Sequence, residues 1–129
     1  MTTFKGPEVL VNLSSKELFE KLSDLRNLKD IMPSEIKKFK ANKESCMISM
    51  DGMPSINMEI REQVPYDKIS LSSKDSPIKF TLICYIQEEG NECQARLEVN
   101  TDANMMIKMM IEKPINNFLN ILSSQLQKL

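Results

Sequence analysis

Glu62 is the acidic side chain whose position best suits proton-transfer chemistry. It follows Met58 and Ile60 at intervals of two residues in a stretch with strand-like alternation, so strand parity predicts that all three point to one apolar face. Desolvation in an apolar cavity raises the pKa of a carboxyl group, which suits a general acid or base near neutral pH. Ser73, on the following predicted strand, is expected to lie opposite or nearly opposite, where it would share a proton or a ligand hydroxyl.

A second interpretation of Glu62 is a solvated side chain at the rim, and we favour it. The residue stands near the end of its predicted strand, just before the turn at Pro65, and lone acidic residues in such places usually reach water. No second catalytic group is evident in the sequence. We therefore assign no catalytic residue and keep Glu62 as a candidate only.

The remaining reactive side chains exclude several kinds of chemistry. The chain has no histidine among its 129 residues, which excludes Ser-His-Asp, Cys-His and His-metal sites. Its cysteines, Cys46, Cys84 and Cys93, lack CxxC spacing, so we expect no metal site and no cofactor. Cys84 and Cys93 have inward parity and are expected to be buried free thiols. An odd number of cysteines and an N-terminus without an apolar signal region predict a cytoplasmic protein.

Charge argues against nucleic acid as a partner. Seventeen basic and eighteen acidic residues give a net charge of −1, so the chain has no long-range field to attract DNA, RNA or an anionic membrane. The basic run of Lys37, Lys38, Lys40 and Lys43 lacks interleaved aromatic residues, and we interpret it as a solvated face. Uncharged apolar stretches stay well below the roughly 20 residues that span a bilayer, so no stable membrane insertion is expected.

Hydrophobic periodicity predicts the elements that position these groups. A strand over residues 3–12 precedes a helix that begins with the capping-box pair Ser14 and Glu17 and ends near Asp24. A second short helix ends before Pro33, since the residue before proline disfavours the helical region. From residue 36 onward the period is two, which predicts six strands.

Short turns join these six strands, so neighbouring strands are expected to be antiparallel. The predicted turns are Lys43-Glu44, Asp51-Gly52 followed by Pro54, Pro65-Tyr66-Asp67, Ser76-Pro77 and Gly90-Asn91. The last segment, 104–128, has an amphipathic helical pattern and contains Pro114. Residues 1–129 are therefore predicted to form a single α+β domain.

Strand parity and helical spacing predict one inward-facing set of side chains between the sheet and the last helix. We interpret it as the wall of a ligand pocket, whereas a packed core is the alternative that stays open. Ten methionines favour an interior that adapts its shape. The predicted lining is Ile48, Met50, Met58, Ile60, Leu71, Ser73, Phe80, Leu82, Leu97, Met110, Ile111, Phe118 and Leu122.

The opposite face of a central strand carries a second candidate surface. Thr81, Ile83 and Tyr85 share outward parity, and an exposed Ile83-Tyr85 stripe would mark a protein contact. The alternative is two apolar residues that stand singly on the surface.

Several short motifs accompany this order of elements. They are Val11-Asn12, Ser15-Lys16-Glu17-Leu18-Phe19, Leu22-Ser23-Asp24, Met32-Pro33, Arg61-Glu62-Gln63-Val64-Pro65 with Ile69, and Glu112-Lys113-Pro114-Ile115-Asn116-Asn117-Phe118. With them the chain resembles, over nearly its whole length, the START-like superfamily, also called SRPBCC, which includes polyketide cyclases/dehydrases and lipid-transport proteins. The C-terminal motif resembles that of small bacterial members whose function is uncharacterised. Being apolar spacings and turns, the motifs indicate fold more strongly than function.

This resemblance implies a helix-grip fold, in which a curved antiparallel sheet of about seven strands wraps around a long C-terminal helix. It also implies a cavity that holds a small apolar molecule. We therefore expect non-catalytic binding of a small apolar or amphipathic, lipid- or polyketide-like molecule. The alternatives are a cyclase, dehydratase or isomerase that uses Glu62, and an adaptor or chaperone-associated module that acts through its outer surface.

Overall fold

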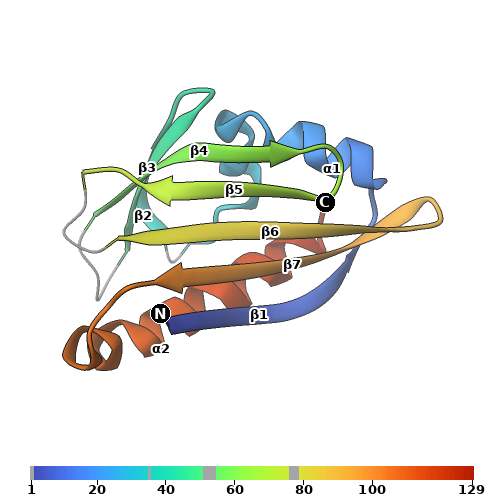
Figure 1. The fold of residues 1–129 in the computed structure, drawn as a ribbon. Helices are drawn as coiled ribbons and strands as arrows, with labels where there is room; N and C mark the ends of the chain where they lie inside the picture. Colours follow the sequence, from blue (N-terminus) through green and yellow to red (C-terminus); the bar gives the residue numbers. More distant parts are fainter. Residues whose placement is uncertain (1, 35, 51–54, 76–78) are drawn as a thin grey trace.

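Seven antiparallel strands form one curled sheet, and a long helix crosses its concave side (Figure 1). The computed structural model describes residues 2–34, 36–50, 55–75 and 79–129. The elements in chain order are β1 (Thr2–Val11), α1 (Ser15–Leu22), the 3₁₀ helix η1 (Leu25–Ile31), β2 (Ile36–Ala41), β3 (Ser45–Met50), β4 (Ile56–Val64), β5 (Lys68–Ser73), β6 (Phe80–Glu89), β7 (Glu92–Thr101) and α2 (Met105–Leu126). This architecture confirms the predicted α+β helix-grip fold.

Strand order shows how the curled sheet is built from local pairings. The order β1-β7-β6-β5-β4-β3-β2 makes β2 to β7 a meander of sequence neighbours, while β1 adds to the outer edge of β7. All six pairings are antiparallel, as the short predicted turns require. The predicted turns at Asp51-Gly52 with Pro54 and at Ser76-Pro77 lie outside the described residues.

Side-chain caps fix where the helices begin. Ser14 Oγ accepts a hydrogen bond from the Glu17 backbone N–H at 3.1 Å and Glu17 accepts from Ser14 N–H at 3.0 Å, which confirms the predicted capping box. Asp24 caps η1, and its ion pair with Arg26 lowers the pKa of its carboxyl group to about 2. Asn104 Oδ1 accepts from Ile107 N–H, so α2 begins at Met105, one residue later than predicted.

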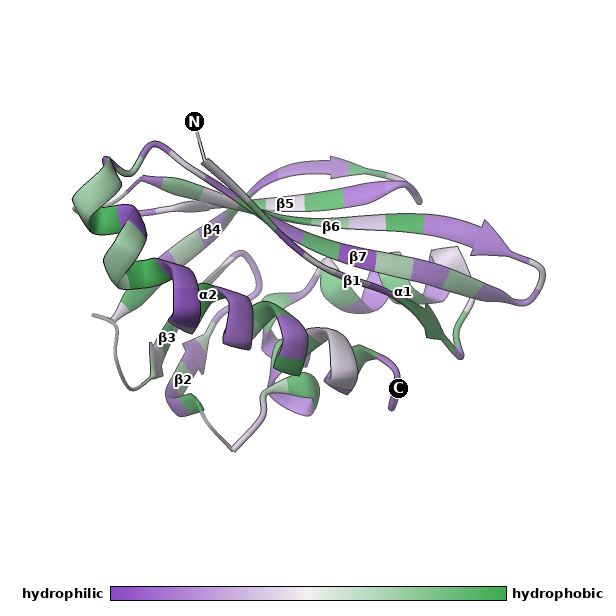
Figure 2. Ribbon diagram, turned by 90° about the horizontal axis from the view of Figure 1, so that it is seen from below, coloured by the Kyte–Doolittle hydropathy of each residue, from purple (hydrophilic) through white to green (hydrophobic). Residues whose placement is uncertain are grey.

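The core lies where α2 meets the sheet. Its buried stripe consists of Ile111, Ile115, Leu119, Leu122, Ser123 and Leu126, which recur at three- and four-residue intervals. Figure 2 shows hydrophilic residues along the side of α2 turned away from the sheet and an apolar N-terminal end. The helix is therefore anchored mainly by the residues that follow Pro114.

Gly6 allows α2 to approach β1 closely. A Cβ atom at this position would lie 3.1 Å from Ser123 Oγ and 3.4 Å from Leu119 Cβ, so a larger residue would push the helix away. The register of β1 on β7 also shifts between Lys5 and Glu8, next to this glycine. Ser123 is only 1% exposed, and its hydroxyl finds no hydrogen-bond partner among the described residues.

We predict that Ser123→Ala stabilises the protein and that Gly6→Ala destabilises it. Removing a buried hydroxyl without a partner should raise the free energy of unfolding by about 1 kcal/mol. Adding a methyl group at Gly6 should lower it by about 1 to 3 kcal/mol because the packed side chains must move apart. Urea unfolding of both variants measures these changes.

The double variant checks that the two effects share one contact. Ser123→Ala removes the atom nearest to the added methyl group, so it should stabilise the Gly6→Ala protein more than it stabilises the wild type. Strictly additive changes would show that Gly6 and Ser123 do not meet.

Candidate functional site

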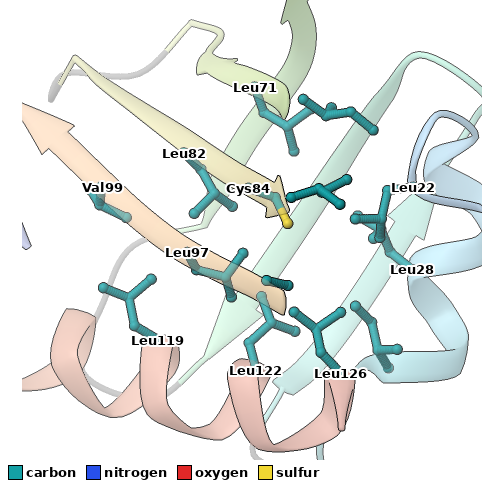
Figure 3. Packing of buried hydrophobic residues seen from close by; sticks show 14 of the residues in the cluster. Leu22, Leu28, Leu71, Leu82, Cys84, Leu97, Val99, Leu119, Leu122 and Leu126 are labelled. Carbon is teal, nitrogen blue, oxygen red and sulfur yellow. The ribbon is translucent and has the colours of Figure 1, made fainter. Parts of the chain in front are cut away.

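A small apolar cavity lies between the sheet, the two short helices and α2. Its volume is about 50 Å³. Figure 3 shows Leu22 and Leu28 facing Leu82, Leu97 and other side chains from the sheet and α2. The lining is Leu22, Leu25, Leu28, Ile31, Met32, Ile48, Met58, Ile69, Leu71, Leu82, Cys84, Leu97, Phe118, Leu122 and Leu126. No charged side chain lines it within the described part of the chain.

Seven predicted pocket residues line this central cavity. They are Ile48, Met58, Leu71, Leu82, Leu97, Phe118 and Leu122. Sequence reasoning missed the wall contributed by α1, η1 and the residue after η1. The apolar spacing of Leu22, Leu25 and Leu28 is visible in the sequence, but periodicity alone does not tell which part of the sheet a short helix covers.

A larger groove opens beside the central cavity, between the β2–β3 edge and α2. Its volume is about 340 Å³, and Phe118 lines both the groove and the central cavity. The groove is lined by Pro33, Ile36, Lys37, Met50, Lys113, Pro114, Asn117, Phe118 and Ile121. Met50 therefore lines the groove rather than the central cavity.

Four other predicted residues lie apart from the central cavity. Ile60 lines a surface depression beside Phe19 of α1. Ser73 and Phe80 lie in an open, mixed-polarity depression at one end of β5 and β6. Ile111 is buried beneath α2 without lining the cavity.

Met110 does not lie against the sheet, so its predicted inward position is wrong. Its exposed fraction is 70%. Successive helical residues are turned by about 100°, and the buried stripe runs through Ile111, Ile115 and Leu119 instead. Met105, Met106 and Met109 are equally exposed on the same end of α2.

Glu62 does not point into the cavity, and the predicted parity is wrong there. Its register partner is Ser70, whereas Ile60 pairs with Leu71, so an irregularity at Arg61 intervenes between them and changes the face. The Glu62 side chain is 51% exposed, and its Oε1 lies 2.9 Å from Lys68 Nζ. This ion pair raises the pKa of Lys68.

Ser73 does not lie opposite Glu62 either. It pairs with Met58 across β4 and β5, and its Oγ accepts a hydrogen bond from the Phe80 backbone N–H at 3.1 Å. Glu62 and Ser73 therefore do not form the predicted pair of a carboxyl group and a hydroxyl group.

The outward surface of β6 is only half exposed. Ile83 and Tyr85 are of intermediate burial, and the Arg96 guanidinium lies 4.6 Å from the centre of the Tyr85 ring. The contact surface predicted for these two residues remains a prediction.

All three cysteines are buried free thiols, which confirms the prediction for Cys84 and Cys93. Burial raises the pKa of Cys46 to about 11 and that of Cys84 to about 12, and it also raises that of Cys93. Among the described residues, no group of three or more His, Cys, Asp or Glu side chains is arranged to hold a metal ion. Nor does any described helix have the length and hydrophobicity needed to cross a membrane.

Comparison with known proteins identifies the fold. No protein-family model and no curated protein matches the sequence. Many solved structures match the fold of the chain, among them the following three, with TM-scores of 0.66 to 0.74; for each of the three, 98% of this chain is covered.

The first of these is a putative uncharacterized protein from Bacillus thuringiensis (TM-score 0.69, 11% identity, 97% of that chain covered). The second is norcoclaurine synthase from Thalictrum flavum in complex with dopamine and hydroxybenzaldehyde (TM-score 0.74, 10% identity, 86% covered). The third is a START superfamily protein from Mycobacterium smegmatis (TM-score 0.66, 10% identity, 97% covered). The chain therefore has a START-like fold, in agreement with the resemblance in its sequence.

We predict that the thiols resist modification while the protein is folded. A thiol whose pKa rises from 9.0 to about 11 has roughly a hundredfold less thiolate near pH 8, and burial slows the reagent further. A thiol-reactive chromogenic reagent should therefore react fully only in denaturant.

The same shifts predict how stability depends on pH. Thiols of the unfolded chain ionise near pH 9 while the folded ones stay protonated, so the free energy of unfolding should fall as pH rises above 9.

A cysteine that reacts with the chromogenic reagent in the native protein at the rate of a free thiol would contradict the observed burial.

Proposed function

We propose that this START-like protein binds a small apolar or amphipathic molecule between its sheet and α2, without catalysing a reaction on it. The observation that carries the proposal is the wholly apolar lining of the central cavity, to which α1, η1, five strands and α2 all contribute. Such a lining offers van der Waals contact and the exclusion of water. The ionisable group that it holds among the described residues is the Cys84 thiol, and burial raises the pKa of that thiol to about 12. The START-like fold supports the proposal at the level of architecture.

Binding requires the central cavity to widen. A cavity of about 50 Å³ is far smaller than the roughly 300 to 1,000 Å³ of typical ligand pockets. Phe118, which is half buried, lines both this cavity and the adjoining groove of about 340 Å³. A change at this side chain is therefore the first place to look for widening of the cavity towards the groove.

Pro114 is a second feature that lets α2 adjust its position. Proline lacks an N–H group, so within α2 the carbonyl group of Met110 receives no helical hydrogen bond from position 114. The residues before Pro114 are mostly exposed, whereas those after it carry most of the buried stripe. The N-terminal half of α2 is thus the part of the helix that can move at least cost, although the α2 residues that line the central cavity all follow Pro114.

The alternative function, an enzyme that uses Glu62, requires the Glu62 carboxyl group to point into the cavity. Glu62 lies on the outer side of β4 beside Lys68, away from the central cavity. Similarity in fold to norcoclaurine synthase, at 10% identity, carries no catalytic residue to this chain. We therefore place binding ahead of catalysis.

We predict that wild-type protein binds one molecule of a neutral environment-sensitive dye, such as Nile red, in the folded state. Met58→Phe should weaken this binding because Met58, 3% exposed, lines the cavity. Met109→Phe is the matched control, since Met109 is exposed on α2 and lines neither space. Fluorescence titration and urea unfolding measure affinity and stability together.

Two results together would contradict the proposed function. One is the absence of saturable dye binding to wild-type protein. The other is a loss of about 1 to 3 kcal/mol of stability in Met58→Phe, the cost expected for overpacking a solid core.

We predict that Glu62→Gln leaves dye affinity and stability nearly unchanged. The substitution removes only an exposed ion pair, and exposed ion pairs contribute little. The pKa of Lys68 should fall towards its ordinary value, which an NMR titration of the lysine side chain measures. If the variant lost ligand binding, or lost a cyclase or isomerase activity present in the wild type, Glu62 would belong to the functional site after all.

A further inference from the structure

We propose that the N-terminal end of α2 is a site for a soft monovalent metal ion, Cu(I), with the thioether sulfur atoms of exposed methionines as its ligands. These methionines are Met105, Met106, Met109 and Met110. The site is separate from the central cavity and from the groove, since none of the four lines either space, and it does not depend on the proposed function.

Solvent exposure sets these four methionines apart from the others that the structure describes. Their exposed fractions run from 70% to 77%. The other described methionines, which are Met32, Met47, Met50 and Met58, are buried or half buried. Figure 2 shows the N-terminal end of α2 as an apolar segment at the periphery of the molecule. The four sulfur atoms are therefore open to an ion that arrives from solution.

Helical spacing brings the four side chains to one face of α2. Successive residues are turned by about 100°, so the four positions lie within roughly 140° of the helix surface, on the side opposite the buried Ile111. Met109 follows Met105 by four residues and Met106 by three, and Met110 follows Met106 by four. Side chains at these spacings are neighbours on a helix. The face thus holds two overlapping groups of three neighbours, and both groups contain Met106 and Met109.

Methionine side chains are long and flexible enough to bring three sulfur atoms to one ion. Cβ atoms three or four residues apart on a helix lie about 5 to 6 Å from each other. Metal–sulfur bonds of roughly 2.3 Å place the sulfur atoms of a trigonal site about 4 Å apart. The three rotatable bonds of each side chain allow this small convergence. Because the side chains are exposed, the convergence requires no change in the core.

The chemistry of the ligands selects the ion. Thioether sulfur is a soft ligand that favours Cu(I), whereas oxygen ligands favour Mg²⁺, Ca²⁺ and Mn²⁺. Thioethers are neutral, and the N-terminal end of a helix carries a positive partial charge. Lys108 and Lys113 also lie on this part of α2, with Glu112 between them. These surroundings oppose a divalent cation more strongly than a monovalent one, so Cu(I) fits better than Zn(II).

An apolar contact surface is the other interpretation of the four side chains, and leucine separates the two. Leucine keeps the apolar surface and the helix propensity of methionine but has no sulfur atom. The quadruple variant Met105→Leu/Met106→Leu/Met109→Leu/Met110→Leu should therefore keep its circular dichroism spectrum and bind Nile red as the wild type does. It should lose Cu(I) binding.

Transfer of Cu(I) from its coloured bicinchoninate complex, in the absence of oxygen, measures the affinity of each protein. We expect the wild type to take up one equivalent of Cu(I). Met109→Leu should weaken binding at least about tenfold, because groups that merely support a metal ligand already contribute about ten- to a hundredfold. Met47→Leu is the matched control, since Met47 is half buried on β3, and it should leave the affinity unchanged.

Ag(I), a redox-inert substitute for Cu(I), locates the site. In an NMR titration of methyl-labelled protein it should shift the methionine methyl signals of the four α2 positions, and Zn(II) should not. Thioethers have no proton to lose, so the Cu(I) affinity should be the same at about pH 6 and about pH 8, whereas binding through cysteine thiolates would strengthen as pH rises.

Any of three results would overturn the proposed metal site. The first is a wild type that takes up no Cu(I) from the complex. The second is a quadruple variant that binds Cu(I) as tightly as the wild type, which would assign the ion to other ligands such as the cysteines. The third is an equal loss of affinity in Met109→Leu and Met47→Leu, or methyl shifts with Zn(II) as large as those with Ag(I). Dye binding, on which the proposed function is tested, is measured separately from all three.

Discussion

Burial of one apolar stripe of α2 against a curled sheet is the constraint on which the rest of the structure depends. A helix this long leaves its apolar side exposed to water unless a surface of matching length covers it. The sheet supplies that surface, and Gly6 lets β1 approach the helix closely near Leu119 and Ser123. Because a curved sheet and a straight helix do not fit along their whole length, space remains between them, and the central cavity and the groove lie there.

The fold was predictable from the sequence because its signals are local and repeated. The capping box at Ser14 and Glu17, the alternation in each strand and the helical stripe near the C-terminus each depend on neighbours in the chain. Side-chain direction was less predictable. Parity assumes that every second side chain of a strand points to the same face. The irregularity at Arg61 breaks this rule and turns Glu62 to the outer side, and no residue pattern in the sequence signals it.

The candidate site was predictable only in its central part. Strand residues near the middle of the sheet, such as Met58, Leu82 and Leu97, line the cavity as expected because sheet parity holds there. The contribution of Leu25 and its neighbours depends on how two short helices pack, and the groove depends on how far apart β2 and α2 lie. Both are tertiary facts that no local pattern encodes. The lysines of the groove were visible in the sequence, but Lys113 and Lys37 are 76 positions apart and only the fold brings them to one groove.

The interior is nearly closed, and the proposed binding requires it to widen, for which the side of the central cavity next to the groove is the candidate place. Wide apolar cavities are costly to keep empty, so a small resting cavity with an adjoining groove reconciles stability with ligand binding. The methionines suit this behaviour, because flexible side chains refill space as the contents change. Met32 and Met58 line the cavity and Met50 lines the groove, while Met105, Met106, Met109 and Met110 lie exposed on α2.

That distribution makes the methionine methyl groups the most direct test of where a ligand binds. In an NMR titration of methyl-labelled protein with dodecanol, we predict that the signals of Met32, Met58 and Met50 shift and saturate at one equivalent, because these side chains line the central cavity or the groove. The exposed methionines of α2 should shift little. Shifts confined to those exposed methionines, or no saturable shift at all, would contradict binding between the sheet and α2.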